Sequence, residues 1–192
     1  MQTDLLTAGI IAVIEQSRFM SRRSYDLLAM NGAPIGYLAK RAPAGSWFSG
    51  RAGSSKFILT RPSGELVATM QRPGSSVRFH LLVTDADDAA VGTVWQVNTV
   101  RARQFELRAS DGLVMRLADG SFGGTDWELA DAADGSLFYG SVRLDSAKPS
   151  GMLGGTQRFA VRLAPTLTGA SRLLAVMATV CLDYLRGSQD RR

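Results

Sequence analysis

Six short segments of this chain each begin with an aromatic residue and then alternate between apolar and polar side chains. The six aromatic residues are Tyr25, Phe57, Phe79, Phe105, Trp127 and Phe159. A period of two turns one face of a segment toward a core and the other toward water, which is typical of a half-buried β-strand. A turn and a second strand-like segment follow each of the first five. The pattern therefore predicts a meander of β-hairpins whose aromatic-led faces point inward.

The turns between the paired segments have the residues that tight hairpins need. Four of them contain Asn31-Gly32, Ser63-Gly64, Asp111-Gly112 and Asp134-Gly135, and Asp85–Asp88 takes the corresponding place in the third unit. Such pairs supply the positive φ angle of a short hairpin turn. The spacing between the aromatic residues is irregular, which favours hairpins with variable loops over a solenoid.

The sixth segment leads instead into an apolar run without charge, Leu173–Leu182, which Arg172 and Asp183 flank. Ten helical residues rise only ~15 Å, about half the thickness of a bilayer core. A helix that is apolar on every side must be surrounded by protein. Twelve strands in a barrel leave an interior about as wide as a helix. We therefore predict a mainly β fold: a closed antiparallel barrel of roughly twelve strands around a central hydrophobic helix, Thr168–Arg186.

The ends of that helix and of the chain give further signals. Thr168 and Ser171 are both suited to cap the start of the helix, and Gly187 is suited to its C-terminal cap. We expect one domain over residues 1–192, with residues 1–9 as an N-terminal arm and residues 188–192 as a frayed tail. No basic residue precedes the apolar stretch Leu5–Ile14, which favours an amphipathic entry segment or a first strand over a signal peptide.

Composition indicates where such a chain works. Cys181 is the only cysteine, so no disulfide can form within the chain, which fits a reducing compartment. We expect a cytoplasmic protein, with a peripheral position at the inner membrane face as a further possibility. Arginine far outnumbers lysine, which is typical of GC-rich bacterial coding.

The order of these elements resembles the tubby-like C-terminal fold, in particular its phospholipid scramblase and LURP-one-related branch. The segments that carry the resemblance are Tyr25–Gly36, Phe57–Val67, Phe105–Met115, Trp127–Leu137 and Ala175–Leu185. The resemblance implies a twelve-stranded barrel around a central hydrophobic helix. It also implies a lipid-related role, since the tubby branch binds phosphoinositides and scramblases move phospholipids between leaflets.

One segment departs from the scramblase pattern. Scramblases carry an acidic calcium-binding segment just before the terminal helix, whereas the corresponding residues here, Gly155–Phe159, include no carboxylate and one positive charge. A calcium ion needs six to eight oxygen ligands, several of them charged. We therefore expect no calcium-triggered activity.

The sequence offers no arrangement typical of a catalytic or metal centre. His80 is the only histidine and falls on the polar face of its segment, and Cys181 lies within the apolar run, where a cysteine behaves as a small hydrophobe. The acidic run Asp85–Asp88 lacks the length of a calcium loop and is best explained as a solvated turn. The glycine-rich stretches do not follow a strand and open a helix, as a phosphate loop would. We predict no enzymatic activity, no metal and no cofactor.

The charge distribution is more informative. Residues 16–78 contain ten basic and two acidic residues, whereas residues 104–192 contain equal numbers of basic and acidic residues. This excess predicts an anionic partner, such as anionic phospholipid or phosphoinositide headgroups. The candidate lipid-binding residues are Arg51, Lys56, Arg61, Arg72 and Arg78. Trp47 and Phe48, beside Arg51 in a glycine-rich loop, form a candidate membrane-contact loop, because aromatic residues near basic ones favour a membrane interface. An equally open interpretation is that the two aromatics cover an end of the barrel and the arginines form a solvated face.

Three functions follow as alternatives. The first is a non-enzymatic binding module for anionic membrane lipids, the second is lipid translocation of the scramblase type without calcium, and the third is a protein-interaction scaffold with no lipid role. Nucleic acid is not an expected partner, since the basic residues fall on strands and loops and match no recognition motif.

Overall fold

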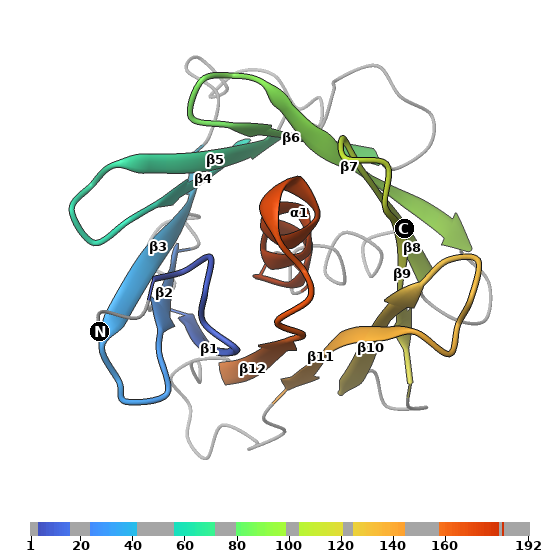
Figure 1. The fold of residues 1–192 in the computed structure, drawn as a ribbon. Helices are drawn as coiled ribbons and strands as arrows, with labels where there is room; N and C mark the ends of the chain where they lie inside the picture. The colour runs from blue at the N-terminus through green and yellow to red at the C-terminus, as the bar shows by residue number, and fades with distance from the viewer. Residues whose placement is uncertain are drawn as a thin grey trace, which may run out of the picture.

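The computed structural model of this chain is a closed antiparallel β-barrel of twelve strands with one short C-terminal helix inside it (Figure 1). The residues described are 4–15, 24–41, 56–71, 80–98, 104–120, 125–144, 158–180 and 182. Each strand pairs with the next along the chain, and β1 closes the ring by pairing with β12. The strands are β1 Ile10–Glu15, β2 Ser24–Leu28, β3 Pro34–Arg41, β4 Lys56–Thr60, β5 Leu66–Gln71, β6 His80–Asp85, β7 Ala90–Asn98, β8 Gln104–Ala109, β9 Val114–Asp119, β10 Asp126–Asp131, β11 Phe138–Leu144 and β12 Arg158–Leu163.

The predicted alternation is confirmed strand by strand. The aromatic residues Tyr25, Phe57, Phe105, Trp127 and Phe159 lie on alternate strands with their side chains buried inside the ring. Phe79 lies outside the described residues, but the strand that follows it alternates as expected. The first strand, β1, comes from the apolar stretch near the N-terminus, so of the two predictions for that stretch the strand is the right one. Because the inner faces of the twelve strands are almost entirely apolar, with Glu15 at the end of β1 as a buried charged residue, the core is one continuous cluster.

The short turns follow the predicted chemistry with one exception. Gly32, Gly64 and Gly112 take positive φ angles, as hairpin glycines do, and Asp88 does so in the acidic turn. The prediction was wrong at Gly135, which is not among the residues with positive φ. There the connection is wider, and the carboxylates of Asp131 and Asp134 hold it by accepting backbone N–H bonds.

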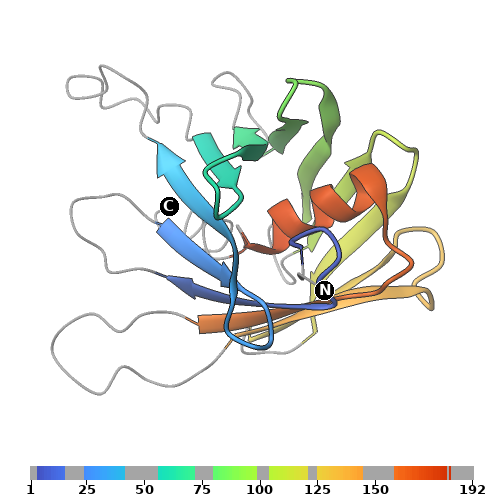
Figure 2. The ribbon, with the colours of Figure 1, turned by 60° about the vertical axis from the view of Figure 1, so that its left-hand side comes forward.

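The helix α1, Gly169–Val180, lies along the inside of the barrel wall (Figures 1 and 2). Every residue from Ser171 to Val180 is buried, which confirms that the run is surrounded by protein. The helix packs mainly against β7 and β8. At Gly92 on β7 a Cβ atom would lie 2.8 Å from the Leu174 side chain, so the absence of a side chain there lets the helix approach the wall. The predicted last turn and tail, residues 183–192, lie outside the described residues.

The start of the helix is capped from another part of the chain. Sequence alone suggested Thr168 or Ser171 as the cap, but the capping carboxylate is that of Asp111, in the β8–β9 turn. Asp111 accepts the backbone N–H of Ser171 at 3.0 Å and its hydroxyl at 2.6 Å. A first-turn N–H has no partner within its own helix, and a carboxylate also suits the positive end of the helix dipole. Ser171 is thus the capped residue, and Thr168 contributes its carbonyl oxygen to the N–H of Arg172.

Candidate functional site

The two ends of the barrel differ in how the strands are joined. At one end, which we call the turn end, short turns at residues 29–33, 61–65, 86–89, 110–113 and 132–137 connect the hairpins, and the helix starts there. We call the other end the opposite end. Figure 2 shows the turn end at the right, with α1 running from it toward the opposite end. Of the six segments that join strands at the opposite end, only Gly120 and Thr125 are among the described residues.

The turn end is acidic. The residues of its turns and of the segment 4–9 that leads into β1 include one basic side chain, Arg61. Their acidic residues are Asp4, Glu65, Asp87, Asp88, Asp111 and Asp134. The carboxylates of Asp111, Asp131 and Asp134 accept hydrogen bonds that favour the charged form. For Asp111, burial raises the pKa, but the bonds from Ser171 and from the Leu113 N–H together outweigh it, and the pKa falls below its ordinary value.

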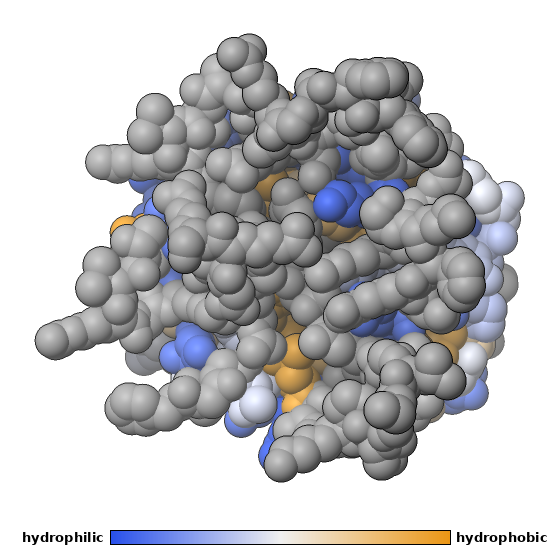
Figure 3. All heavy atoms as spheres, turned by 180° about the vertical axis from the view of Figure 1, so that it is seen from behind, coloured by the Kyte–Doolittle hydropathy of each residue, from blue (hydrophilic) through white to orange (hydrophobic). Residues whose placement is uncertain are grey.

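The opposite end is basic in sequence. Its six joining segments contain nine basic residues and one acidic residue, Asp145. The basic residues are Arg18, Arg22, Arg23, Arg51, Arg72, Arg78, Arg101, Arg103 and Lys148. Among the described strand ends at this end, Lys56 pairs in register with Arg41 on one side and Gln71 on the other. Viewed from this end, hydrophobic side chains of described residues are visible toward the middle of the ring and hydrophilic ones around them (Figure 3).

The structure separates two of the candidate lipid-binding residues that the sequence grouped together. Lys56 begins β4 at the opposite end, while Arg61 follows β4 at the turn end, five residues or about 17 Å away. Arg61 is already engaged there, since its guanidinium contacts the carboxylates of Asp4 at 2.5 Å and Glu65 at 3.4 Å. Arg61 therefore does not share a surface with Lys56. The other candidates, Arg51, Arg72, Arg78, Trp47 and Phe48, lie outside the described residues.

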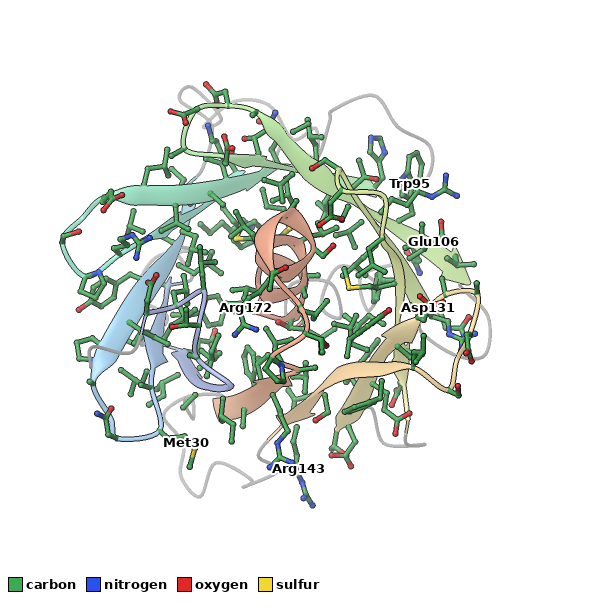
Figure 4. All side chains as sticks on the ribbon, viewed as in Figure 1. Met30, Trp95, Glu106, Asp131, Arg143 and Arg172 are labelled. Atoms are coloured by element: carbon green, nitrogen blue, oxygen red, sulfur yellow. The ribbon has the colours of Figure 1, made fainter. Side chains whose placement is uncertain are left out.

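Sequence reasoning missed a buried cation inside the barrel. Arg172 is 4% exposed, and Figure 4 shows its side chain within the ring. Its guanidinium donates to the carbonyl oxygens of Ala8 at 2.5 Å, Ala164 at 3.3 Å and Leu167 at 3.4 Å. Desolvation lowers its pKa. These contacts tie the helix to the N-terminal segment and to the link after β12, so Arg172 holds the turn end together. The only signal in the sequence was a charge at the edge of an apolar run.

A second missed feature is an aromatic pair on the outer wall. The ring of His80 on β6 stacks on that of Trp95 on β7, with centroids 4.6 Å apart and planes 14° apart. His80 is thus on the outward face, as the alternation predicts. Trp95 and Val97 are both in phase with Thr93, and this spacing of two was the available signal that they face outward.

Potential metal ligands do not cluster among the described residues. No group of three histidine, cysteine, aspartate or glutamate side chains among them is placed to bind a metal. A shallow groove at the turn end is lined by Ala8, Gly9, Ile10, Ala29, Met30 and Asn31, none of which is ionisable. None of the helical residues described forms a segment long and apolar enough to cross a bilayer.

No family model, no curated protein and no solved structure matches this chain. The function must therefore be argued from the barrel itself.

Proposed function

We propose that this barrel is a non-enzymatic module that binds anionic membrane lipids with its opposite end. The observation that carries the proposal is the separation of charge between the two ends. Six acidic residues lie on the short turns and the segment before β1, whereas the sequence of the segments that join strands at the other end contains nine basic residues and one acidic residue. The described strand ends at that end add Lys56 and also Asp119 and Asp126, of which Asp126 pairs with Arg143. Each basic residue held near an anionic bilayer contributes about 1 kcal/mol to binding. The resemblance to tubby-like proteins, which bind phosphoinositides, supports the same class of ligand.

The length of the barrel makes this separation effective. The strands span from about 17 Å for the five residues of β4 to about 30 Å for the nine residues of β7. Charges in physiological salt are screened over about 8 Å. When the basic end touches an anionic surface, the acidic turns are therefore about two to four screening lengths away and do not cancel the attraction. The same geometry sets the orientation, because approach by the acidic turn end is repulsive.

Vesicle co-sedimentation tests the proposal. The wild-type protein is mixed with phosphatidylcholine vesicles and with vesicles that also contain phosphatidylglycerol, phosphatidylserine or phosphoinositide, at low and high salt. We expect binding only with the anionic lipid, weakening as salt increases. Joint substitution of Arg51, Lys56, Arg72 and Arg78 with glutamine should abolish binding without lowering the melting temperature.

Arg61→Gln is the matched control, because it removes the same kind of charge at the turn end. It should leave vesicle binding unchanged. Equal binding of the wild type to neutral and anionic vesicles at low salt would refute the proposal and favour the protein-interaction scaffold. A fluorescent-lipid assay on reconstituted vesicles separates binding from translocation, and we expect no acceleration of lipid exchange between leaflets.

A further inference from the structure

The outer wall carries an exposed apolar patch near the end that the proposed function turns toward the membrane. Trp95 and Val97 are 36% and 60% exposed, and both lie among the last four residues of β7, which ends at Asn98 at the opposite end. Of the four other large exposed hydrophobic residues among those described, Met30, Leu137 and Phe138 lie at the turn end. The fourth, Tyr37 on β3, pairs in register with Thr60, the last residue of β4 at the turn end. Trp95 and Val97 are therefore the pair placed beside the basic end.

The Trp95 ring is held in one orientation and its N–H has a hydrogen-bond acceptor. His80 stacks against the indole of Trp95, which fixes the orientation of the ring. The indole N–H donates to the Thr93 hydroxyl at 3.0 Å. Moving the ring out of water therefore leaves no unpaired donor, which would otherwise carry a large penalty. An exposed tryptophan held in this way is suited to a partly apolar environment.

Charge around the patch is also balanced. Glu106 on β8 lies opposite Trp95 in register, and Figure 4 shows both on the outer side of the wall. The Glu106 carboxylate accepts a bond from the Arg108 guanidinium at 2.6 Å. Because Arg108 neutralises it, Glu106 does not repel an anionic surface. The patch is thus apolar and without net negative charge, and Arg101 and Arg103 follow it within six residues in the sequence.

We propose that Trp95 and Val97 insert into the interfacial layer of an anionic bilayer when the basic end docks, so that the barrel leans with β7 toward the membrane. The inference rests on the proposed function. It commits to a bilayer as the occupant because the chain continues from the patch into Arg101 and Arg103, whose charge is complementary to anionic headgroups. Tryptophan is enriched at the depth of the headgroups, where its ring is half in the apolar phase. The basic residues attract the protein to the membrane over a long range. The patch then adds a short-range hydrophobic contribution to the binding free energy.

The test follows the fluorescence of Trp95 in the full chain. The chain has three tryptophans, of which Trp127 is fully buried. In a Trp47→Phe background, Trp95 then reports alone on contact with vesicles of phosphatidylcholine and phosphatidylglycerol. We expect a blue shift on binding and quenching by lipids brominated on the acyl chain. Separately, the affinity of Val97→Ser is compared with that of Met30→Ser, which removes a more exposed apolar side chain at the turn end.

We expect Val97→Ser to weaken binding about fivefold, from the apolar area lost, and Met30→Ser to leave it unchanged. Trp95→Ser should weaken binding further, and Val97→Ser keeps the test valid if that variant does not fold. If the wild type binds anionic vesicles but Trp95 is not quenched and Val97→Ser matches Met30→Ser, the insertion is refuted while lipid binding stands. If the wild type does not bind anionic vesicles at all, both proposals are refuted.

Discussion

The packing of α1 against β7 of the barrel wall can be tested by substituting Gly92. An alanine Cβ at this position would lie 2.4 Å from the carbonyl oxygen of Arg108 and 2.8 Å from Cδ2 of Leu174. Carbon and oxygen atoms normally come no closer than about 3.3 Å, so β7 and β8 would have to separate by about 1 Å. Overpacking of this kind costs about 1–3 kcal/mol, and the contact with backbone places Gly92→Ala at the upper end. In a domain of this size we expect a fall in melting temperature of about 6–12 °C.

Two other glycines provide matched controls for thermal and urea unfolding. Gly9→Ala meets no atom within 4 Å and has no left-handed φ, so its stability should stay within about 0.5 kcal/mol of wild type. Gly112→Ala also has open space but a φ of +92°, so it isolates backbone strain, about 1–2 kcal/mol. Destabilisation should increase in the order Gly9→Ala, Gly112→Ala, Gly92→Ala, because the first has neither strain nor clash and the second has strain alone. Gly92 combines a φ of +157° with clashes against the Arg108 carbonyl oxygen and the Leu174 side chain.

A second substitution distinguishes the helix contact from the strand contact. Leu174→Ala alone should destabilise by about 2–5 kcal/mol because Leu174 is fully buried. It also removes the atom that the new methyl group meets, so the double variant should be at least about 1 kcal/mol more stable than the sum of the single effects predicts. Additive effects, or a Gly92→Ala variant as stable as Gly9→Ala, would show that α1 does not rest against β7.

Three further outcomes are expected. Met177→Asp places an unpaired charge in the fully buried core, which costs several kcal/mol out of a margin of about 5–15 kcal/mol, so circular dichroism should show an unfolded or molten chain. Because the pKa of Asp111 is lowered in the folded protein, its contribution is present above the unfolded value of about 4 and is lost as pH falls through the folded value. Wild type should therefore lose up to about 1 kcal/mol at acid pH relative to Asp111→Asn in urea titrations, a small effect because the carboxylate is largely exposed. Calcium at micromolar to low-millimolar concentration should give no heat in calorimetry and no change in melting temperature. A saturable stabilisation by calcium would contradict the expectation that Gly155–Phe159 does not bind this ion.

Much of the fold could be predicted because its signals are local. Alternation within a strand, and glycine within a turn, depend on residues a few positions apart. The contacts at the N-terminus of α1 involve residues that are distant in the sequence, and no local sequence pattern predicts them. Asp111 caps a helix sixty residues further along the chain, and Arg172 reaches the carbonyl of Ala8 across the barrel. Thr168 and Ser171 were predicted as caps from residues near the helix start alone. In the structure a carboxylate from a neighbouring turn caps the helix instead.

The candidate site could be predicted less well, for a geometric reason. An antiparallel meander sends successive connections to alternate ends, so a run of basic residues in the sequence is divided between two surfaces. Arg61 and Lys56 lie five residues apart and at opposite ends of β4. The net charge of residues 16–78 therefore overestimates the positive charge of any one end of the barrel. The difference in charge between the two ends appears only when the connections are grouped by the end at which they lie.

The two ends do not carry equal information about function. The acidity of the turn end follows from folding, since Asp85, Asp111, Asp131 and Asp134 each accept a backbone N–H within or beside their own turns. Aspartate is favoured in such turns because its short carboxylate reaches these donors, whatever the protein binds. No comparable rule of turn formation calls for arginine. The basic residues in the sequence of the segments that join strands at the opposite end are therefore the charges that turn formation leaves unexplained, and the anionic partner that we propose would account for them.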